Sequence, residues 1–207
     1  MRRNSSIFIA RDGWLFMVGA ILLLIVAIRT HSMALGLFAL VLLVLLILLF
    51  RDPPREIPSV PLAVVAPVDG RVIAVAFTDK GVLEREAAHI TIRVDNFGAY
   101  TARSPIEGKV LNLQDNFAAG SRLTGVNGLW VRTDEDDDVV VLMKAPRMFR
   151  PKSFINYGER LGQGQPYGFV RLTRRVEVYV PLNSRVAVAV GDYVRAGNDI
   201  LARLVHD

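Results

Sequence analysis

The chain has no cysteine among its 207 residues. This excludes disulfides, thiolate metal sites and a cysteine nucleophile. Histidine is also rare, and His31, His89 and His206 are far apart in the sequence, which disfavours a metal site made of several histidines. No window after residue 58 has a long helical period of 3.6 residues, so we expect that part of the chain to be mostly β.

Charged residues are absent from two apolar segments near the N-terminus. Residues 14–28 and 33–50 contain none, and a polar turn, Arg-Thr-His-Ser, lies between them. A helix that spans a bilayer needs about 20 apolar residues, a length that the second segment nearly reaches and the first does not. We therefore expect a helical membrane hairpin, either with both ends on one face of the bilayer or lying in one leaflet. A cleaved signal peptide and a single bent helix fit less well, because the apolar run is doubled and interrupted.

Basic residues near the ends of this hairpin predict its orientation. Arginines lie before the first segment and after the second, whereas the connecting turn has Arg29 alone. The positive-inside rule therefore predicts an inner-membrane protein with residues 51–207 in the cytoplasm. The formal net charge of +5 favours anionic lipid head groups beside such an anchor. We expect membrane phospholipid as a partner and no nucleic acid, and leave open a homo-oligomer or pairing with another membrane protein.

The remainder of the chain predicts a linker and one β domain. Residues 51–58 are rich in proline, which cannot continue a helix. We therefore divide the chain into a membrane-anchoring hairpin (1–50), a linker (51–58) and a mainly β domain of barrel or sandwich type with lipoyl-like hairpin elements (59–207). The segments that read as strands are 71–77, 89–94, 109–113, 129–133, 139–144, 169–172, 176–180 and 186–190.

An internal repeat and an acidic run add detail. Residues 66–73 (Ala-Pro-Val-Asp-Gly-Arg-Val-Ile) match residues 104–111 (Ser-Pro-Ile-Glu-Gly-Lys-Val-Leu) position by position in residue type. Each motif predicts the start of a hairpin in a pseudo-symmetric barrel. The acidic run at 133–138 lacks the spaced ligands and glycine turn of a calcium loop, so we interpret it as a solvated hairpin tip. We expect no metal site.

Taken together, these motifs resemble the phosphatidylserine decarboxylase family in its short bacterial and archaeal form. The resemblance runs nearly end to end, through the apolar pair of segments and a series of motifs in the same order. These motifs are residues 50–55 (Phe-Arg-Asp-Pro-Pro-Arg), 66–70 (Ala-Pro-Val-Asp-Gly), 103–110 (Arg-Ser-Pro-Ile-Glu-Gly-Lys-Val), 171–181 and 191–197.

The resemblance implies a chemistry that this chain does not keep intact. Members of the family are proenzymes in which a Gly-Ser bond cuts itself, and the serine becomes a pyruvoyl group that acts as an electron sink. The family aspartate is retained as Asp69, the family histidine falls on Tyr100, and Gly-Ser falls on Thr173 and Arg174. Tyrosine is a poor base at neutral pH, and arginine has no hydroxyl. A pyruvoyl group therefore cannot form at Arg174, and we expect no cofactor.

Three functions follow, in order of preference. The first is a non-catalytic, membrane-anchored relative in phospholipid metabolism, in which Arg171, Arg174 and Arg175 bind a phosphate or carboxylate head group unless they only face solvent. The second is an active decarboxylase with unorthodox residues, using Asp69 as acid or base and, after a one-residue slip, Thr173 as nucleophile. Leu172 would then replace the glycine before the cut. The third is a membrane adaptor of lipoyl-like β-sandwich type, disfavoured because no coiled coil is present.

Overall fold

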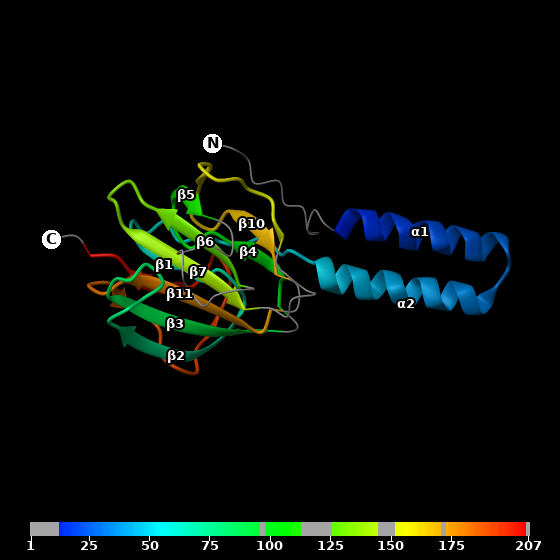
Figure 1. Cartoon of the computed structure of the whole chain (residues 1–207). Helices are drawn as coiled ribbons and strands as arrows, with labels where there is room; N and C mark the ends of the chain where they lie inside the picture. Colours follow the sequence, from blue (N-terminus) through cyan, green and yellow to red (C-terminus); the bar gives the residue numbers. More distant parts are fainter. Residues whose placement is uncertain (1–12, 96–97, 113–125, 145–151, 171–172, 206–207) are drawn as a thin grey trace. The chain divides into compact units, whose positions relative to one another are not determined.

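The computed structural model describes residues 13–95, 98–112, 126–144, 152–170 and 173–205. The chain divides into two compact units, Met1–Pro54 and Arg55–Asp207. The described part of the first unit consists of two helices, and that of the second consists of strands and turns (Figure 1).

The first unit is an antiparallel pair of helices, α1 (Trp14–Arg29) and α2 (Met33–Phe50), which confirms the two predicted helices. At the turn, His31 adopts a left-handed φ of 51°, and Ser32 Oγ accepts a hydrogen bond from Leu35 N at 3.4 Å as an N-cap. Small residues pack between the helices, where Ala20 and Ala39 are buried.

Most of the larger apolar side chains of the helices are exposed. Leu15 is 80% exposed and Met33 is 92% exposed. By length and composition α2 can cross a membrane, whereas α1 is shorter. An apolar surface of this kind is typical of a segment that contacts lipid or another protein.

The second unit contains short antiparallel strands. They are β1 (Ala63–Val65), β2 (Gly70–Thr78), β3 (Ala87–Val94), β4 (Thr101–Arg103), β5 (Gly108–Asn112), β6 (Val126–Arg132), β7 (Asp138–Lys144), β8 (Lys152–Ser153), β9 (Arg160–Leu161), β10 (Pro166–Phe169), β11 (Arg175–Pro181), β12 (Arg185–Val186), β13 (Tyr193–Val194) and β14 (Ile200–Arg203).

Among the described residues these strands form one large sheet and two small ones. The eight-stranded sheet has the order β13-β2-β3-β11-β7-β6-β5-β9, and the three-stranded sheets have the orders β1-β14-β12 and β4-β10-β8. The predicted mainly β architecture is confirmed. The described strands do not close into a barrel, because the large sheet ends at β13 and β9, each two residues long and each with a single neighbour.

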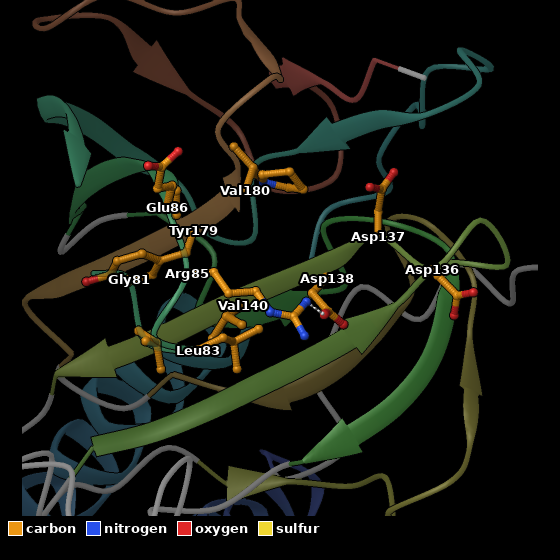
Figure 2. Close-up of a pocket in the computed structure, with 13 residues that line it drawn as sticks. Gly81, Leu83, Arg85, Glu86, Asp136, Asp137, Asp138, Val140, Tyr179 and Val180 are labelled. Carbon is orange, nitrogen blue, oxygen red and sulfur yellow. Dashed lines mark hydrogen bonds and ion pairs between the residues drawn. The ribbon is translucent and has the colours of Figure 1, made fainter. Parts of the chain in front are cut away.

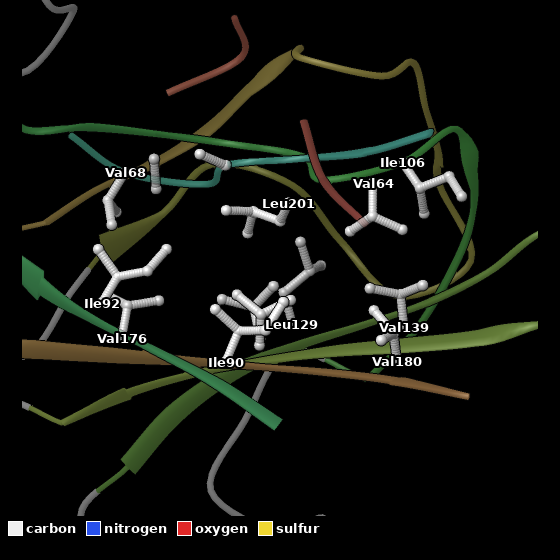
Figure 3. Packing of buried hydrophobic residues seen from close by; sticks show 14 of the residues in the cluster. Val64, Val68, Ile90, Ile92, Ile106, Leu129, Val139, Val176, Val180 and Leu201 are labelled. Carbon is white, nitrogen blue, oxygen red and sulfur yellow. The ribbon is translucent and has the colours of Figure 1, made fainter. Parts of the chain in front are cut away.

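The core lies against one face of the large sheet. Period-two alternation points Ile90 and Ile92 of β3 and Val176 of β11 inward, all with at most 1% exposure. Figure 3 shows them facing Val64 of β1 and Leu201 of β14 across the packed interior. The small sheet that contains β1 therefore covers the inner face of the large sheet.

The repeated motifs occupy equivalent places in this fold. Val65 N donates to Pro105 O at 2.8 Å, and Arg103 N donates to Pro67 O at 2.9 Å, so each motif binds the other reciprocally. The similarity of residues 66–73 and 104–111 in sequence thus corresponds to a pseudo-twofold relation in space.

The glycines of the two motifs are packed alike. A Cβ on Gly70 would lie 2.2 Å from the carbonyl oxygen of Arg93, and a Cβ on Gly108 would lie 2.2 Å from that of Arg132. Only glycine lets β2 and β5 approach the neighbouring strand so closely. Gly70 and Gly108, and with them Arg93 and Arg132, are therefore pseudo-equivalent pairs.

Six of the predicted strands overlap β2, β3, β5, β6, β7 and β11. The prediction for 186–190 was wrong beyond Val186, where β12 ends. Ala189 N bonds to Asp192 Oδ2 at 2.8 Å and Gly191 has a φ of 104°, so this segment turns. The predicted strand at 169–172 overlaps β10 only at Phe169, its last residue. Residues 171–172 lie outside the described part. The acidic run forms the turn between β6 and β7.

Candidate functional site

The carboxylate of Asp69 joins three segments that are far apart in the chain. Its Oδ2 accepts hydrogen bonds from Arg55 Nη2 at 2.6 Å and from Ala99 N at 3.0 Å, and its Oδ1 accepts one from Ala196 N at 2.7 Å. Asp69 is only 4% exposed. Both carboxylate oxygens accept from donors, and these contacts tie the linker, the loop after β3 and the turn after β13 together.

Arg55 is the cation that balances this buried charge. Its side chain is 10% exposed and forms the ion pair with Asp69. A buried carboxylate without such a partner is costly. Sequence reasoning used Arg55 only for membrane orientation and did not find this role. The available signal was its place in the motif at residues 50–55.

Gly98 lets the loop after β3 approach Asp69. A Cβ at this position would lie 2.7 Å from the Cβ of Asp69, closer than side chains tolerate. The neighbouring Ala99 can therefore present its N–H to the carboxylate. Sequence reasoning did not single out Gly98.

Tyr100, which the sequence resemblance alone aligns with a histidine, is buried in the same loop. Its ring packs at a tilt against Phe169 of β10, with 6.1 Å between the centroids. Burial, and then the charge of Asp95, raises the pKa of Tyr100 above the ordinary value. A raised pKa favours the neutral phenol, which is a poor general base at physiological pH.

Thr173 and Arg174 lie beside the end of β3. Val94 N donates to Arg174 O at 3.1 Å, and the next residue, Asp95, donates its N–H to Asp69 O at 3.0 Å. The Thr173 side chain is buried and that of Arg174 is exposed. The end of β3 and the loop after it thus bring the main chain at Arg174 to the same end of the sheet as Asp69 and Tyr100.

Arg174 and Arg175 are exposed, and Arg175 is the first residue of β11. Arg171 lies outside the described residues.

Tyr193 is a further residue of this region that the sequence did not reveal. Its hydroxyl donates to Asp95 Oδ2 at 2.9 Å. Burial raises the pKa of Tyr193 to about 12, assisted by the hydrogen bond to Asp95 and by the charges of Asp95 and Asp69. Tyr193 is thus a hydrogen-bond donor at any physiological pH.

A separate titratable cluster lies farther along β3. The His89 ring stacks on Tyr179 with 4.6 Å between centroids, and its Nε2 lies 3.1 Å from Thr91 Oγ1 and 3.8 Å from Glu177 Oε2. Burial lowers the pKa of His89, and the charge of Glu177 opposes this effect. Both contacts use the same ring nitrogen, so His89 is not oriented as the base of a nucleophile–base–acid relay.

A cavity of about 190 Å³ lies elsewhere, between the loop after β2 and the start of β7. Figure 2 shows Leu83, Val140 and Tyr179 at its wall, with Arg85 reaching Asp138 at 3.3 Å. None of the predicted site residues lines it. Within the described ranges, no three His, Asp or Glu side chains gather where they could hold a metal ion.

Comparison with known proteins gives a consistent set of relatives. The chain is 38% identical over 206 residues to a phosphatidylserine decarboxylase proenzyme of Nitrosomonas europaea, covering 94% of each chain. It is 36% identical over 209 residues to the proenzyme of Cupriavidus metallidurans, covering 95% of each. No protein-family model matches the chain. A solved glucose permease IIA of Mycoplasma capricolum aligns at 14% identity and a TM-score of 0.48, over 68% of this chain and 94% of that one.

Proposed function

Since the chain belongs to the phosphatidylserine decarboxylase family, we propose that it is a non-catalytic, membrane-anchored member of that family. In this proposal the chain stays uncut and forms no pyruvoyl group. It acts in phospholipid metabolism by binding rather than by releasing carbon dioxide.

The observation that supports this proposal most strongly is Arg174. The resemblance places it where the family has the serine that becomes the pyruvoyl group. Its side chain has no hydroxyl and is exposed, while the neighbouring Thr173 side chain is buried. No nucleophile equivalent to the family serine is therefore presented at this bond.

The surroundings of Asp69 also support a structural use of the retained acid. Its two oxygens accept from Arg55, Ala99 and Ala196 and hold three segments of the chain together. An acid–base catalyst needs an oxygen free to exchange a proton with its substrate. The neutral phenol of Tyr100 cannot replace the family histidine as the base.

The proposal places the protein at a membrane. Residues 1–50 form the anchor, 51–58 the linker and 59–207 the β domain, with the β domain on the cytoplasmic side of the inner membrane. The apolar helix α2 supports anchoring. Arg174 and Arg175, both exposed beside the site, are the proposed contacts for an aminophospholipid head group.

The test is decarboxylation by the full-length chain in detergent–lipid micelles that contain phosphatidylserine labelled in its carboxyl group. We expect carbon dioxide release no faster than in micelles without protein. The Nitrosomonas europaea proenzyme, prepared in the same way, is the positive control. Release that exceeds the protein-free background, and that a carbonyl-trapping reagent abolishes, would overturn the proposal in favour of an active decarboxylase.

A further inference from the structure

Four basic side chains stand in one row across the large sheet. The strand register pairs Arg71 of β2 with Arg93 of β3, Arg93 with Arg175 of β11, and Arg175 with Lys144 of β7. We call Arg71, Arg93, Arg175 and Lys144 the basic row. Directly opposed residues on neighbouring antiparallel strands have Cβ atoms about 4.5–5.5 Å apart, so the row is a closely spaced line of cations.

The basic row faces away from the core. The residues next to it in each strand, Val72, Ile92, Val176 and Met143, belong to the buried core cluster. Alternation along the strands therefore points the four basic side chains to the opposite face of the sheet. All four are exposed.

Little negative charge lies against this row in the described part of the chain. Lys144 pairs with Glu177 at 2.5 Å, but Arg71, Arg93 and Arg175 make no ion pair with any described residue. Asp95, one residue past the end of β3, accepts its hydrogen bond from Tyr193. Like charges directly opposite one another destabilise a sheet, so the row has a cost that the ion pair of Lys144 with Glu177 offsets only in part.

The other half of the internal repeat shows that the fold can neutralise such a row. Arg132 is the pseudo-equivalent of Arg93, but the residue opposite it is Asp138, with which it forms an ion pair at 2.8 Å. Arg160 of β9 likewise pairs with Asp134 and Glu107. At the equivalent place in the basic row, Arg93 faces Arg175 instead of an acid.

We propose that the basic row is a docking surface for an anionic phospholipid bilayer. The inference rests on the proposed membrane anchoring of residues 1–50. A bilayer is the polyanion that the chain itself brings close to the row. Arg55 lies only five residues after Phe50, the last residue of α2. Arg55 is also paired with Asp69, which lies two residues before Arg71. Five residues extend at most about 18 Å, so the chain itself tethers Arg55 within that distance of a bilayer that holds α2.

The absence of native cysteine allows a direct measurement on the full-length chain. Ala74 lies opposite Thr91 on the same sheet, and a cysteine there accepts an environment-sensitive fluorophore close to the row. The labelled protein is inserted into nanodiscs of phosphatidylcholine alone or mixed with phosphatidylglycerol, both with a nitroxide quencher on the lipid head group. We expect quenching about twofold stronger in the anionic discs, and loss of this difference at 1 M salt, where the Debye length is about 3 Å.

Two variants make the test specific to the row. Arg71→Glu abolishes the difference between anionic and neutral discs. Lys109→Glu makes the same charge change at the pseudo-equivalent position. The two positions correspond because Tyr193 lies opposite Arg71 and Arg160 lies opposite Lys109. We expect Lys109→Glu to leave the difference between anionic and neutral discs intact. Both positions are exposed, and each new glutamate faces an arginine.

The outcomes separate this inference from the anchoring on which it rests. Failure of the chain to enter either kind of disc overturns the anchoring. Entry into both with equal quenching, or equal loss in the two variants, overturns the docking surface alone. A fluorescence response to duplex DNA without any response to anionic discs would also overturn it, by identifying a nucleic acid as the occupant.

Discussion

Replacement of Asp69 by asparagine will lower the free energy of unfolding of the β unit by about 3–5 kcal/mol. The substitution keeps the shape of the side chain but leaves Arg55 as an unpaired, nearly buried cation. One oxygen of the carboxylate also becomes an NH₂ group, which faces an N–H donor instead of accepting from it. The measurement is urea unfolding of the full-length chain in detergent, followed by the fluorescence of Trp130 in β6 in a Trp14→Phe background.

The chain supplies a matched control for this substitution. Glu107 occupies the corresponding position of the second motif, but it is exposed and its contact with Arg160 is 3.4 Å long. Glu107→Gln is expected to change the free energy of unfolding by less than about 0.5 kcal/mol. If Asp69→Asn proves as mild as Glu107→Gln, the structural role assigned to Asp69 is wrong.

Adding a methyl group at Gly70 is expected to cost about 3 kcal/mol, at the upper end of overpacking effects. The new Cβ would lie 2.2 Å from the carbonyl oxygen of Arg93, so β2 and β3 must move apart. Because Gly108 has the same contact with Arg132, Gly108→Ala should cost the same within about 1 kcal/mol. Both values come from the urea unfolding experiment described for Asp69.

The control for the glycines is Gly162, in the turn after β9. A Cβ there would meet only the tip of the Gln165 side chain, at 3.6 Å. Gly162→Ala should therefore change the stability by less than about 1 kcal/mol. Unequal costs at Gly70 and Gly108 would contradict the pseudo-twofold relation on which the comparison of Arg93 with Arg132 depends. A cost at Gly162 as large as that at Gly70 would contradict the close contact with the neighbouring strand as the cause.

Local patterns predicted the elements that depend on local physics. Alternation of Val, Glu, Val, Tyr and Val predicted the central part of β11, and the charge-free segments predicted α1 and α2. The Pro-x-acid-Gly repeat indicated a pseudo-symmetric arrangement, and the two motifs indeed bind each other reciprocally. Proline, glycine and strand alternation act within a few residues, so their effects can be read along the chain.

Contacts between distant segments could not be predicted in this way. Nothing in the local sequence pairs Arg55 with Asp69, or places Arg93 opposite Arg175, because both depend on how segments meet in the folded chain. The predicted strand at 186–190 failed for a different, local reason. Its apolar alternation suits a strand, but the side chain of Asp192 bonds to the backbone of Ala189 and ends the pairing in a turn.

Intact mass spectrometry of the purified full-length chain tests the central claim most directly. An uncut, non-catalytic family member gives one species near 22.9 kDa. That mass should persist after prolonged incubation with phosphatidylserine micelles. Two fragments that divide the chain beside Thr173, the C-terminal one blocked by a keto acid, would contradict the account.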